Sequence, residues 1–377
     1  MSDVTESIKN GYTYRADGSR DHRYKITRIE SISSGVINTE KLGSSDEVNE
    51  NYRLVDGDIL FSHINSLPYI ANTALYTADL GEIYHGMNLL NIRSRHEEID
   101  SHFLLHLLKK ESTRDWFRII AKPAVNQASI STTEVGSFKF LIPGMEEQKK
   151  ISSSLDNLDH LITLHQRKCD DTKKLKKYML QKMFPKNGEK FPEIRFKGFT
   201  EAWEQRKLGE VFKEYSEKNH TELPALTIIQ GGGTVKREES DRNLMYDESN
   251  LSNYKMVRKD DFIVHLRSFE GGLEKSLLDG IISPAYHTFH SDVADSRFYY
   301  PYFRSHEFIK HKLVPHVYGI RDGRSIDIAG MKTIEIPYTS IEEQRKIGDY
   351  LESLDHLITL HQRKCDDTKK LKKYMLQ

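Results

Sequence analysis

Cysteine is nearly absent from this sequence: the 377 residues include only Cys169 and Cys365. A fold that is stabilised by several disulfide bonds needs more cysteines than two, so this composition favours a protein of a reducing compartment. Long apolar runs are missing as well. No window approaches the roughly 18 uninterrupted apolar residues of a membrane helix, and the first residues have no apolar segment of the signal-peptide kind. We therefore expect a soluble, cytoplasmic protein with no membrane association.

An excess of charge of either sign is also lacking. The 56 lysines and arginines balance the 56 aspartates and glutamates, so the formal net charge is zero. This balance of charge does not by itself indicate a nucleic-acid-binding protein. It does not exclude one either, because such binding needs a local basic face and not a basic average.

Motifs of catalysis are missing too. There is no Gly-x-x-x-x-Gly-Lys-Ser/Thr loop, and Gly231-Gly232-Gly233 lacks the spacing of a dinucleotide fingerprint. The Asn/Asp-Pro-Pro-aromatic motif of amino-methyltransferases does not occur. Glu147-Gln148-Lys149 has the Glu-x-Lys spacing of many nucleases, but no Pro-Asp partner lies upstream, and acidic residues suit a helix start. No local arrangement marks a nucleophile, so we expect no active site in this chain.

What the sequence does contain is a long exact repeat. Residues 158–181 read LDHLITLHQRKCDDTKKLKKYMLQ and recur unchanged as residues 354–377. The similarity extends upstream, where Glu146-Glu147-Gln148 recurs as Glu342-Glu343-Gln344. The apolar residues of each copy follow one another by threes and fours, as on one stripe of a helix. Neither stripe can be buried alone, so we expect the two helices to pack together as an antiparallel coiled coil.

The repeated His-x-x-x-Cys pairs admit a second interpretation. His165 and Cys169, with His361 and Cys365, could form a two-His, two-Cys zinc site, because zinc accepts these ligands. Yet these residues occupy seam positions, where a small thiol and an imidazole are ordinary packing groups. We therefore predict no metal.

Two dissimilar blocks alternate with the repeated helices. Strand patterns occur at residues 24–32, 57–64, 84–92 and 138–143, and a helical pattern occurs between residues 101 and 120. The second block repeats this order of patterns. Asp260–Ser268 corresponds to Gly57–Ser66, residues 298–312 correspond to the first helical pattern, and Thr333–Pro337 corresponds to residues 138–143. We predict an α+β protein with two globular α/β domains joined by two long antiparallel helices. The predicted boundaries are a first domain at 1–145, a first helix at 146–184, a linker at 185–202, a second domain at 203–341 and a second helix at 342–377.

The ordered motifs resemble the specificity subunit of type I restriction-modification systems. They are the helix starts at Ile142–Gln148 and Ile336–Gln344, the repeated helices, the Lys-Met-Phe-Pro exit at Lys182, the stretch Phe196–Phe212 and Gly280–Phe289. One departure is that the stretch Trp203–Phe212 has no counterpart before Gly11. The edge of the first domain is therefore expected to be incomplete, or to be closed by the C-terminal end.

The resemblance implies a non-catalytic subunit with two target-recognition domains. Each would read one half of a split site on double-stranded DNA, while the helices set the gap and dock two methyltransferase subunits. Restriction subunits would join the full complex. S-adenosylmethionine, ATP and Mg²⁺ would belong to these partners and not to this chain. The alternative is a scaffold whose two domains bind proteins, which would lack the strong salt dependence that phosphate contacts give.

Candidate DNA contacts are side chains with paired donors or acceptors, and small polar or basic groups for phosphates. Each also has the plainer interpretation of a solvated loop residue. In the first domain the candidates are Tyr12, Tyr14, Arg15, His63, Asn65, Ser66, Asn126, Gln127 and Ser129. In the second domain they are Thr234, Lys236 and Arg237 after the triple glycine, His265, Arg267 and Ser268 after a strand, and Tyr318, Arg321, Arg324 and Ser325. The triple glycine itself has two interpretations: its missing side chains let the backbone approach a phosphate, or it is merely a flexible turn. The lysine run from Lys173 to Lys177 is either a solvated helix face or a track for phosphates or an acidic partner.

Overall fold

The structure is a computed structural model that describes residues 1–13, 23–124, 126–186, 189–240, 248–265, 267–319 and 325–376. The chain divides into two compact units. The first consists of residues 1–165 and 363–377, and the second of residues 166–362. Each unit therefore contains a globular part and sections of both long helices.

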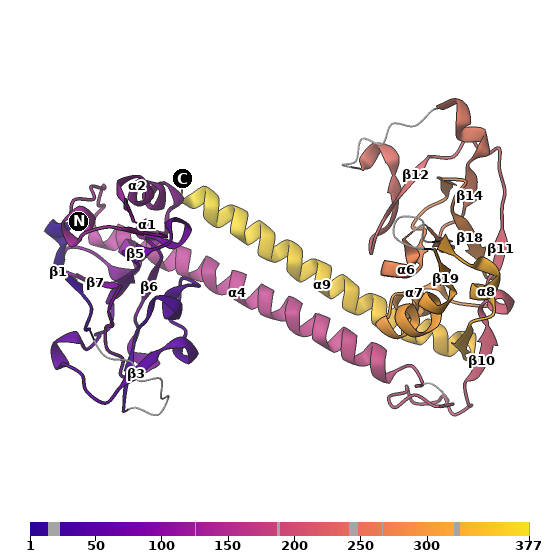
Figure 1. Ribbon diagram of the computed structural model, residues 1–377, viewed down its shortest axis with the longest axis horizontal. Coiled ribbons are helices and arrows are strands. Elements are labelled where there is room, and N and C mark those ends of the chain that lie inside the picture. Colours follow the sequence, from indigo (N-terminus) through magenta and orange to yellow (C-terminus); the bar gives the residue numbers. More distant parts are fainter. Residues whose placement is uncertain are drawn as a thin grey trace. The chain divides into compact units, whose positions relative to one another are not determined.

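A four-stranded antiparallel sheet forms the centre of the first unit, with the strand order β1-β7-β4-β6. Its strands β1, β7 and β6 are labelled in Figure 1. Its strands are β1 (Thr5–Asn10), β4 (Ile59–Phe61), β6 (Thr73–Leu75) and β7 (Leu90–Ser94). The central strand β4 is fully buried, because Ile59 and Phe61 lie in one apolar cluster and Leu60 in another. Successive side chains point to opposite faces of a strand, so this sheet carries a core on both faces.

Two short helices cover the face of the sheet on which Phe61 lies. They are α1 (Ser101–Lys109) and α2 (Glu111–Ile120), whose Leu104 and Phe117 join the same cluster. Asp100 caps α1 by accepting a hydrogen bond of 2.8 Å from the N–H of Phe103. The remaining elements of the unit are the strands β2 (Tyr24–Ile26), β3 (Gly43–Ser45), β5 (Ile64–Asn65), β8 (Lys122–Ala124) and β9 (Gln127–Ser129), the helix α3 (Thr132–Gly136), and the 3₁₀ helices Ser2–Val4, Ile29–Ile32, Thr39–Lys41, Glu50–Tyr52, Leu67–Tyr69 and Ala78–Leu80.

The second unit repeats this sheet with different side chains. Its strand order is β11-β18-β15-β16, again antiparallel, and the strands are β11 (Lys213–Tyr215), β15 (Phe262–Val264), β16 (Glu274–Lys275) and β18 (His287–His290). Its core is rich in aromatic rings: Phe262 packs edge-on against Phe303, with 5.0 Å between the ring centroids. The two units therefore share a sheet topology and differ in what fills it.

The other elements of the second unit surround this sheet. They are the strands β10 (Glu204–Lys207), β12 (Leu226–Ile229), β13 (Gly233–Lys236), β14 (Lys255–Val257), β17 (Gly280–Ile282), β19 (Val317–Tyr318), β20 (Ser325–Ile326) and β21 (Glu335–Tyr338), the helices α5 (Leu208–Val211), α6 (Ser268–Gly271), α7 (Ser296–Phe303) and α8 (Ile328–Lys332), a π-helical turn at Phe308–Leu313, and 3₁₀ helices at Arg237–Glu239, Glu248–Asn253 and Val314–His316.

The repeated sequence forms the two longest helices, α4 (Met145–Lys182) and α9 (Ile341–Met375). They pair antiparallel within each unit. In the first unit Lys372 donates to Asp159 at 2.5 Å, and the thiol of Cys365 lies 3.8 Å from the carbonyl of Ile162. In the second unit the repeated residues make the same contacts, between Lys176 and Asp355 and between Cys169 and Ile358. The mixed α and β architecture with two long antiparallel helices agrees with the predicted fold class.

Five local predictions were wrong in detail. Residues 24–32 form the short strand β2 and then a 3₁₀ helix. Only the end of the stretch 84–92 is a strand, β7. The helical pattern at 101–120 breaks between α1 and α2 at Lys110, and the pattern at 298–312 divides into α7 and a π-helical turn. Residues 138–143 form no strand, although their counterpart β21 does.

Candidate nucleic-acid interface

In the first unit, the end of the central strand β4 lies beside the β8–β9 hairpin. The chain leaves β4 through His63 and enters β5, which pairs with β9 so that Asn65 faces Ala128 and Ile64 faces Ser129. Two stretches that the sequence separates widely, both predicted as DNA candidates, are thereby brought together. Pairing between β5 and β9 is the reason, since the register of the strands fixes which residues lie opposite each other.

The tip of this hairpin presents two amide side chains to solvent. Asn126 and Gln127 are exposed, and Asn126 has a φ of 63°, a left-handed conformation that asparagine tolerates better than most residues. Ser129 and Ser66 are half-buried. Asn65 is held locally, because its amide donates to Ser62 at 3.1 Å and its oxygen accepts from the N–H of Ser66. The exposed amides of Asn126 and Gln127 are of the kind that can bond both hydrogen-bonding atoms at the major-groove edge of adenine.

His63 lies beneath this surface. It is 7% exposed, and burial lowers the pKa of its imidazole to about 4. Its carbonyl accepts a hydrogen bond from the N–H of Ile130 at 2.9 Å. The imidazole is therefore neutral at pH 7, and its burial places it under the hairpin instead of at a base edge.

Tyr12 is half-buried and is fixed by its backbone, which bridges to Gly86, and by its ring, which lies 5.4 Å from that of Tyr52. Tyr14 and Arg15 lie outside the described residues.

In the second unit the end of β15 forms a small polar cluster. Ser268 is buried, and its hydroxyl accepts from the N–H of His265 at 2.9 Å. The N–H of Arg267 donates to Nδ1 of His265. Burial, aided by the charge of Arg304, lowers the pKa of His265 to about 4. Of the three candidates here, only Arg267 is exposed.

The β19–β20 hairpin takes the place of β8–β9 in the second unit, since each hairpin directly precedes a short helix, α3 or α8. Tyr318 pairs with Ser325 in this hairpin and is 60% exposed. Arg321 and Arg324 lie outside the described residues. The second hairpin thus offers an aromatic ring where the first offers amides.

The glycine-rich turn between β12 and β13 is bound internally. The N–H of Gly231 donates to the buried carboxylate of Glu274 at 2.7 Å, and the N–H of Gly233 donates to it at 3.3 Å. Tyr300 and Arg304 bond the same carboxylate. These two backbone donors, which one interpretation of the sequence placed against a phosphate, are therefore already engaged.

The three candidates that follow this turn differ in their access to solvent. Thr234 is 1% exposed, and its hydroxyl accepts from the N–H of Leu277. Lys236 is exposed, and Arg237 lies over the ring of Tyr254 at 5.6 Å. Lys236 and Arg237 are therefore accessible from solvent, whereas Thr234 is not.

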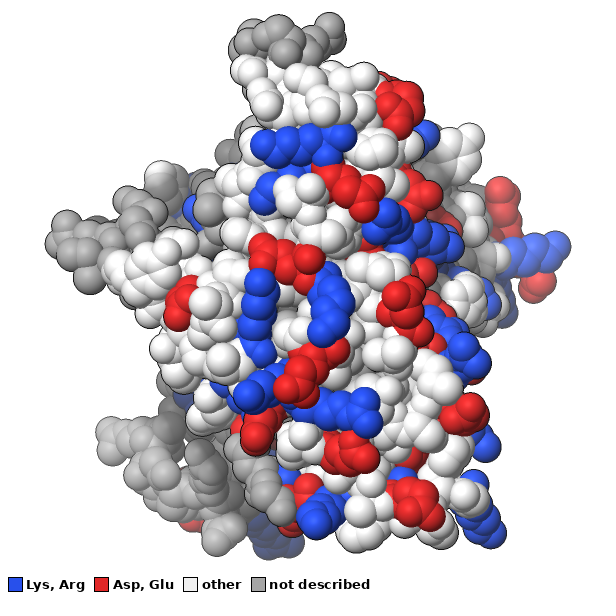
Figure 2. Space-filling model, turned by 90° about the vertical axis from the view of Figure 1, so that its right-hand side faces the viewer, with Lys and Arg blue, Asp and Glu red and all other residues white. Residues whose placement is uncertain are grey.

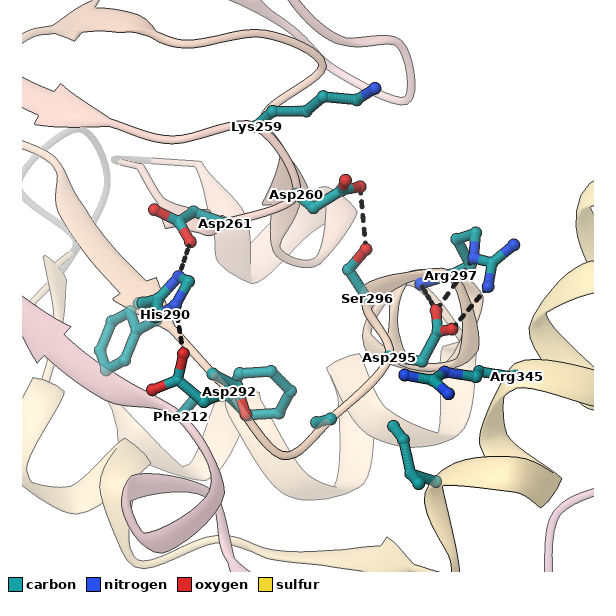
Figure 3. Close-up of a pocket in the computed structure, with 14 residues that line it drawn as sticks. Phe212, Lys259, Asp260, Asp261, His290, Asp292, Asp295, Ser296, Arg297 and Arg345 are labelled. Carbon is teal, nitrogen blue, oxygen red and sulfur yellow. Dashed lines mark hydrogen bonds and ion pairs between the residues drawn. The ribbon is translucent and has the colours of Figure 1, made fainter.

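An acidic pocket of about 330 Å³ lies in the second unit, among Lys259, Asp260, Asp261, His290, Asp295 and Arg345 (Figure 3). His290 lies between Asp261 and Asp292 and bonds both. Several carboxylates line this pocket, and some of them are bonded to other side chains of the protein. Their negative charge makes the pocket unsuited to a phosphate. The sequence did not reveal it, because its residues come from separate segments.

A second hollow, of about 580 Å³, lies in the first unit, and its walls include Tyr69, Asn72, Lys109 and Arg114. Lys109 donates to the carbonyl of Gly35, and burial lowers the pKa of its ammonium group. Arg114 donates to Asn72 at 2.7 Å and lies 3.9 Å from the carboxylate of Glu111. Asp159, bonded to Lys372, lines the same wall, so cations and carboxylates are mixed in this hollow. Sequence analysis missed them, since nothing in the local pattern distinguishes them from solvated helix residues.

Charges do not segregate over the face shown in Figure 2, where lysines and arginines alternate with aspartates and glutamates. In the lysine run, Lys176 is bonded to Asp355, whereas Lys173, Lys174 and Lys177 are exposed.

The thiol of Cys169 lies 3.7 Å from the side-chain oxygen of Gln362, and within the described residues no three His, Cys, Asp or Glu side chains gather as a metal site. None of the helices in that part of the chain is both long and apolar enough to span a bilayer.

Comparison with known proteins gives consistent matches. The family model of the type I restriction modification DNA specificity domain matches residues 1–173. The MjaX specificity subunit of a type I restriction enzyme from Methanocaldococcus jannaschii is 30% identical over 393 residues, covering 100% of this chain and 90% of the relative. The MjaVIII specificity subunit of the same organism is 26% identical over 326 residues, covering 79% and 75%.

The fold also has a solved counterpart. The crystal structure of a type I restriction-modification S subunit from M. genitalium superposes with a TM-score of 0.63 at 14% identity, covering 100% of this chain and 93% of that one. The chain therefore belongs to the family of type I restriction-modification specificity subunits, whose role is DNA sequence specificity. Members of this family are non-catalytic, and catalysis lies on other subunits.

Proposed function

We propose that each unit reads one half of a bipartite site on double-stranded DNA. The observation that carries this is the repetition of one sheet topology with divergent surface side chains. The hairpin that precedes the short helix α3 presents Asn126 and Gln127, and the hairpin that precedes α8 presents Tyr318. One scaffold with two different reading surfaces suits two different half-sites, because sequence is read by side chains at base edges.

The two long helices set the gap between the half-sites and dock two methyltransferase subunits. Their exact sequence repeat supports this role, since a common partner needs the same surface twice. Restriction subunits join the complete enzyme, and S-adenosylmethionine, ATP and Mg²⁺ are bound by the partners. The protein works in the cytoplasm.

In the first unit, the direct contacts are the exposed amides of Asn126 and Gln127, supported by Asn65, Ser66 and Ser129 beneath them. In the second unit they are Arg267, Lys236, Arg237, Tyr318 and Ser325. The buried candidates His63, Ser268 and Thr234 and the half-buried His265 position these loops, because their side chains lie below the exposed candidates.

The test is methylation of a randomised DNA library by this chain co-expressed with its methyltransferase subunit, followed by sequencing of the modified sites. The expected product is two short half-sites with an unspecified gap, and exchange of residues 1–145 for those of a relative should change one half only. Methylation without sequence preference would contradict the proposal. A protein-binding scaffold, the alternative, would join partners without salt-dependent DNA binding.

A further inference from the structure

A buried carboxylate fixes the exposed turn between β12 and β13 in the second unit. Glu274 is 0% exposed, and it accepts hydrogen bonds from the N–H groups of Gly231 and Gly233, at 2.7 and 3.3 Å. Tyr300 donates to it at 2.8 Å, and the guanidinium of Arg304 bonds it as well. The turn is therefore tied to the interior, although residues 229–232 are exposed.

The central sheet does not need this acid. Asp58 and Asp261 occupy the same position in the two units, since each carboxylate accepts from the backbone N–H three residues before it. The strand residues two positions after them pair with Ala74 in the first unit and with Glu274 in the second. Ala74 lies in an apolar cluster. Because a buried carboxylate is costly unless it is paired, its presence in one unit alone indicates a local role at the turn.

The first unit holds a glycine turn by a simpler contact. Lys109 and Arg304 correspond, because each lies nine residues after the N-cap residue of its helix, α1 or α7. The ammonium group of Lys109 donates directly to the carbonyl of Gly35 at 2.9 Å. Gly35 and Gly231 both have a left-handed backbone, with φ of 79° and 82°. A cation at one position of both units therefore fixes a turn, directly in the first unit and through Glu274 in the second.

Gln230 is a side chain of the second turn that is suited to reading a base. It is exposed, and its amide lies against Gly271 at the end of α6, where a Cβ atom would clash with Nε2. The helix α6 directly follows Arg267, the exposed candidate after β15. Glutamine can bond both hydrogen-bonding atoms at the major-groove edge of adenine. The turn therefore holds an exposed amide beside a surface that is already expected to contact DNA.

We propose that Gln230 is a base-contacting residue of the second unit, and that Glu274 and Arg304 are positioning residues that hold its turn. The inference rests on the function proposed above and adds a reading segment to it. The buried carboxylate fixes the backbone of the turn through two N–H groups, and Gly271 leaves room for the amide. An amide held in place loses less conformational freedom on binding than a mobile one, and so contributes more to recognition.

The test uses methylation of the randomised library by the full chain with its methyltransferase subunit. In the half-site that exchange of residues 1–145 leaves unchanged, Gln230→Ala should reduce the base preference at one position by about fivefold or more. Gly271→Ala should weaken the preference at the same position, because its methyl group displaces the amide without removing it. Gln205→Ala, at an exposed glutamine of β10, should change neither half-site.

The positioning role has its own readout. Glu274→Gln removes the charge that holds Arg304, and it should weaken the preference at the position that Gln230→Ala affects. The double variant should show no weaker preference there than Gln230→Ala alone, since both changes act on one contact. In the full chain without DNA, Glu274→Gln should speed hydrogen exchange at residues 230–233, while β11 and β18 keep their protection.

The opposite results are equally specific. A wild-type library with two half-sites that Gln230→Ala leaves unchanged overturns the proposal. Faster exchange throughout the second unit in Glu274→Gln, with an unaltered base preference, shows a structural role alone and overturns the positioning role. A wild-type chain that methylates without sequence preference contradicts the function proposed above, and this proposal with it.

Discussion

The side-chain oxygen of Gln148 accepts a hydrogen bond of 2.9 Å from the backbone N–H of Asp100, the residue that caps α1. Gln344 makes the same contact with Asp295, the cap of α7, at 3.0 Å. Both glutamines are buried, and they occupy the same position of the repeat. Each long helix is thereby fixed to one helix of the globular part in its unit, α4 to α1 and α9 to α7.

Gln148→Ala should loosen α1 while leaving α7 unchanged. The substitution removes the acceptor for Asp100 and the donor to the carbonyls of Glu98 and Pro143. Buried groups left unsatisfied cost about 1–3 kcal/mol. Hydrogen exchange should report faster opening of α1 only, and Lys149→Ala, at an exposed neighbouring position, should have no effect. Equal loosening in both units would contradict this assignment.

The Asp261–His290 pair should make the second unit more sensitive to alkaline pH than the first. In the first unit the guanidinium of Arg93 bonds the buried carboxylate of Asp58. In the second unit His290 corresponds to Arg93 and bonds Asp261, which corresponds to Asp58. Hydrogen bonds to Asp261 and Asp292 raise the pKa of His290 although burial opposes them. Stability from this pair is complete below the unfolded pKa of about 6.5 and is lost as pH rises through the folded value.

His290→Arg should therefore remove this pH dependence. The effect should be below about 1 kcal/mol, since His290 is partly exposed to solvent that screens the pair. It can be followed by urea unfolding of the second unit at pH 6 and pH 9. His356→Gln, at an exposed histidine, is the control. A slope that His290→Arg leaves unchanged would rule out this origin.

Acid should weaken the first unit through His63. Burial lowers its pKa to about 4, whereas an unfolded histidine has a pKa of about 6.5. The unfolded chain binds the proton first, so stability present above about pH 6.5 is lost as pH falls towards 4. His63→Leu should reduce this loss by ~1–3 kcal/mol, measured as the shift of the urea midpoint between pH 7 and pH 4.5. An unchanged shift would show that other groups govern acid unfolding.

Gln127→Ala should relax recognition at one position of one half-site. A bidentate amide contact with a base discriminates by about 1–3 kcal/mol, or roughly 5- to 150-fold. Tyr318→Ala should act on the other half-site alone. Sequencing of methylated library DNA measures both, and each variant has its unaltered half as an internal control. Changes in both halves from either substitution would refute the assignment of one unit to one half.

The long helices and their antiparallel pairing could be predicted because a strict apolar stripe repeats without change over many turns. Short strands were harder. Residues 138–143 and Thr333–Pro337 have similar patterns, yet only the second forms a strand, because pairing needs the partner β10 and cannot be read from the segment itself.

The candidate contacts illustrate the same limit. Asn126 and Gln127 lie exposed at the tip of a hairpin, but polarity alone could not distinguish them from His63, which is buried beneath it. One of the two interpretations of the triple glycine placed its backbone against a phosphate. The N–H groups of Gly231 and Gly233 instead bond Glu274, a residue distant in sequence with no local signal of this role.

The helix contacts described above come in pairs that the repeat interchanges. Asp159 with Lys372 and Asp355 with Lys176 are the same pair, as are Cys365 with Ile162 and Cys169 with Ile358. Each helix is thus complementary to its own sequence, and the pair is an isologous interface folded into one chain. A cut in the linker would leave two polypeptides that each carry the whole recognition code of that interface, so either of them could pair with a second copy of itself.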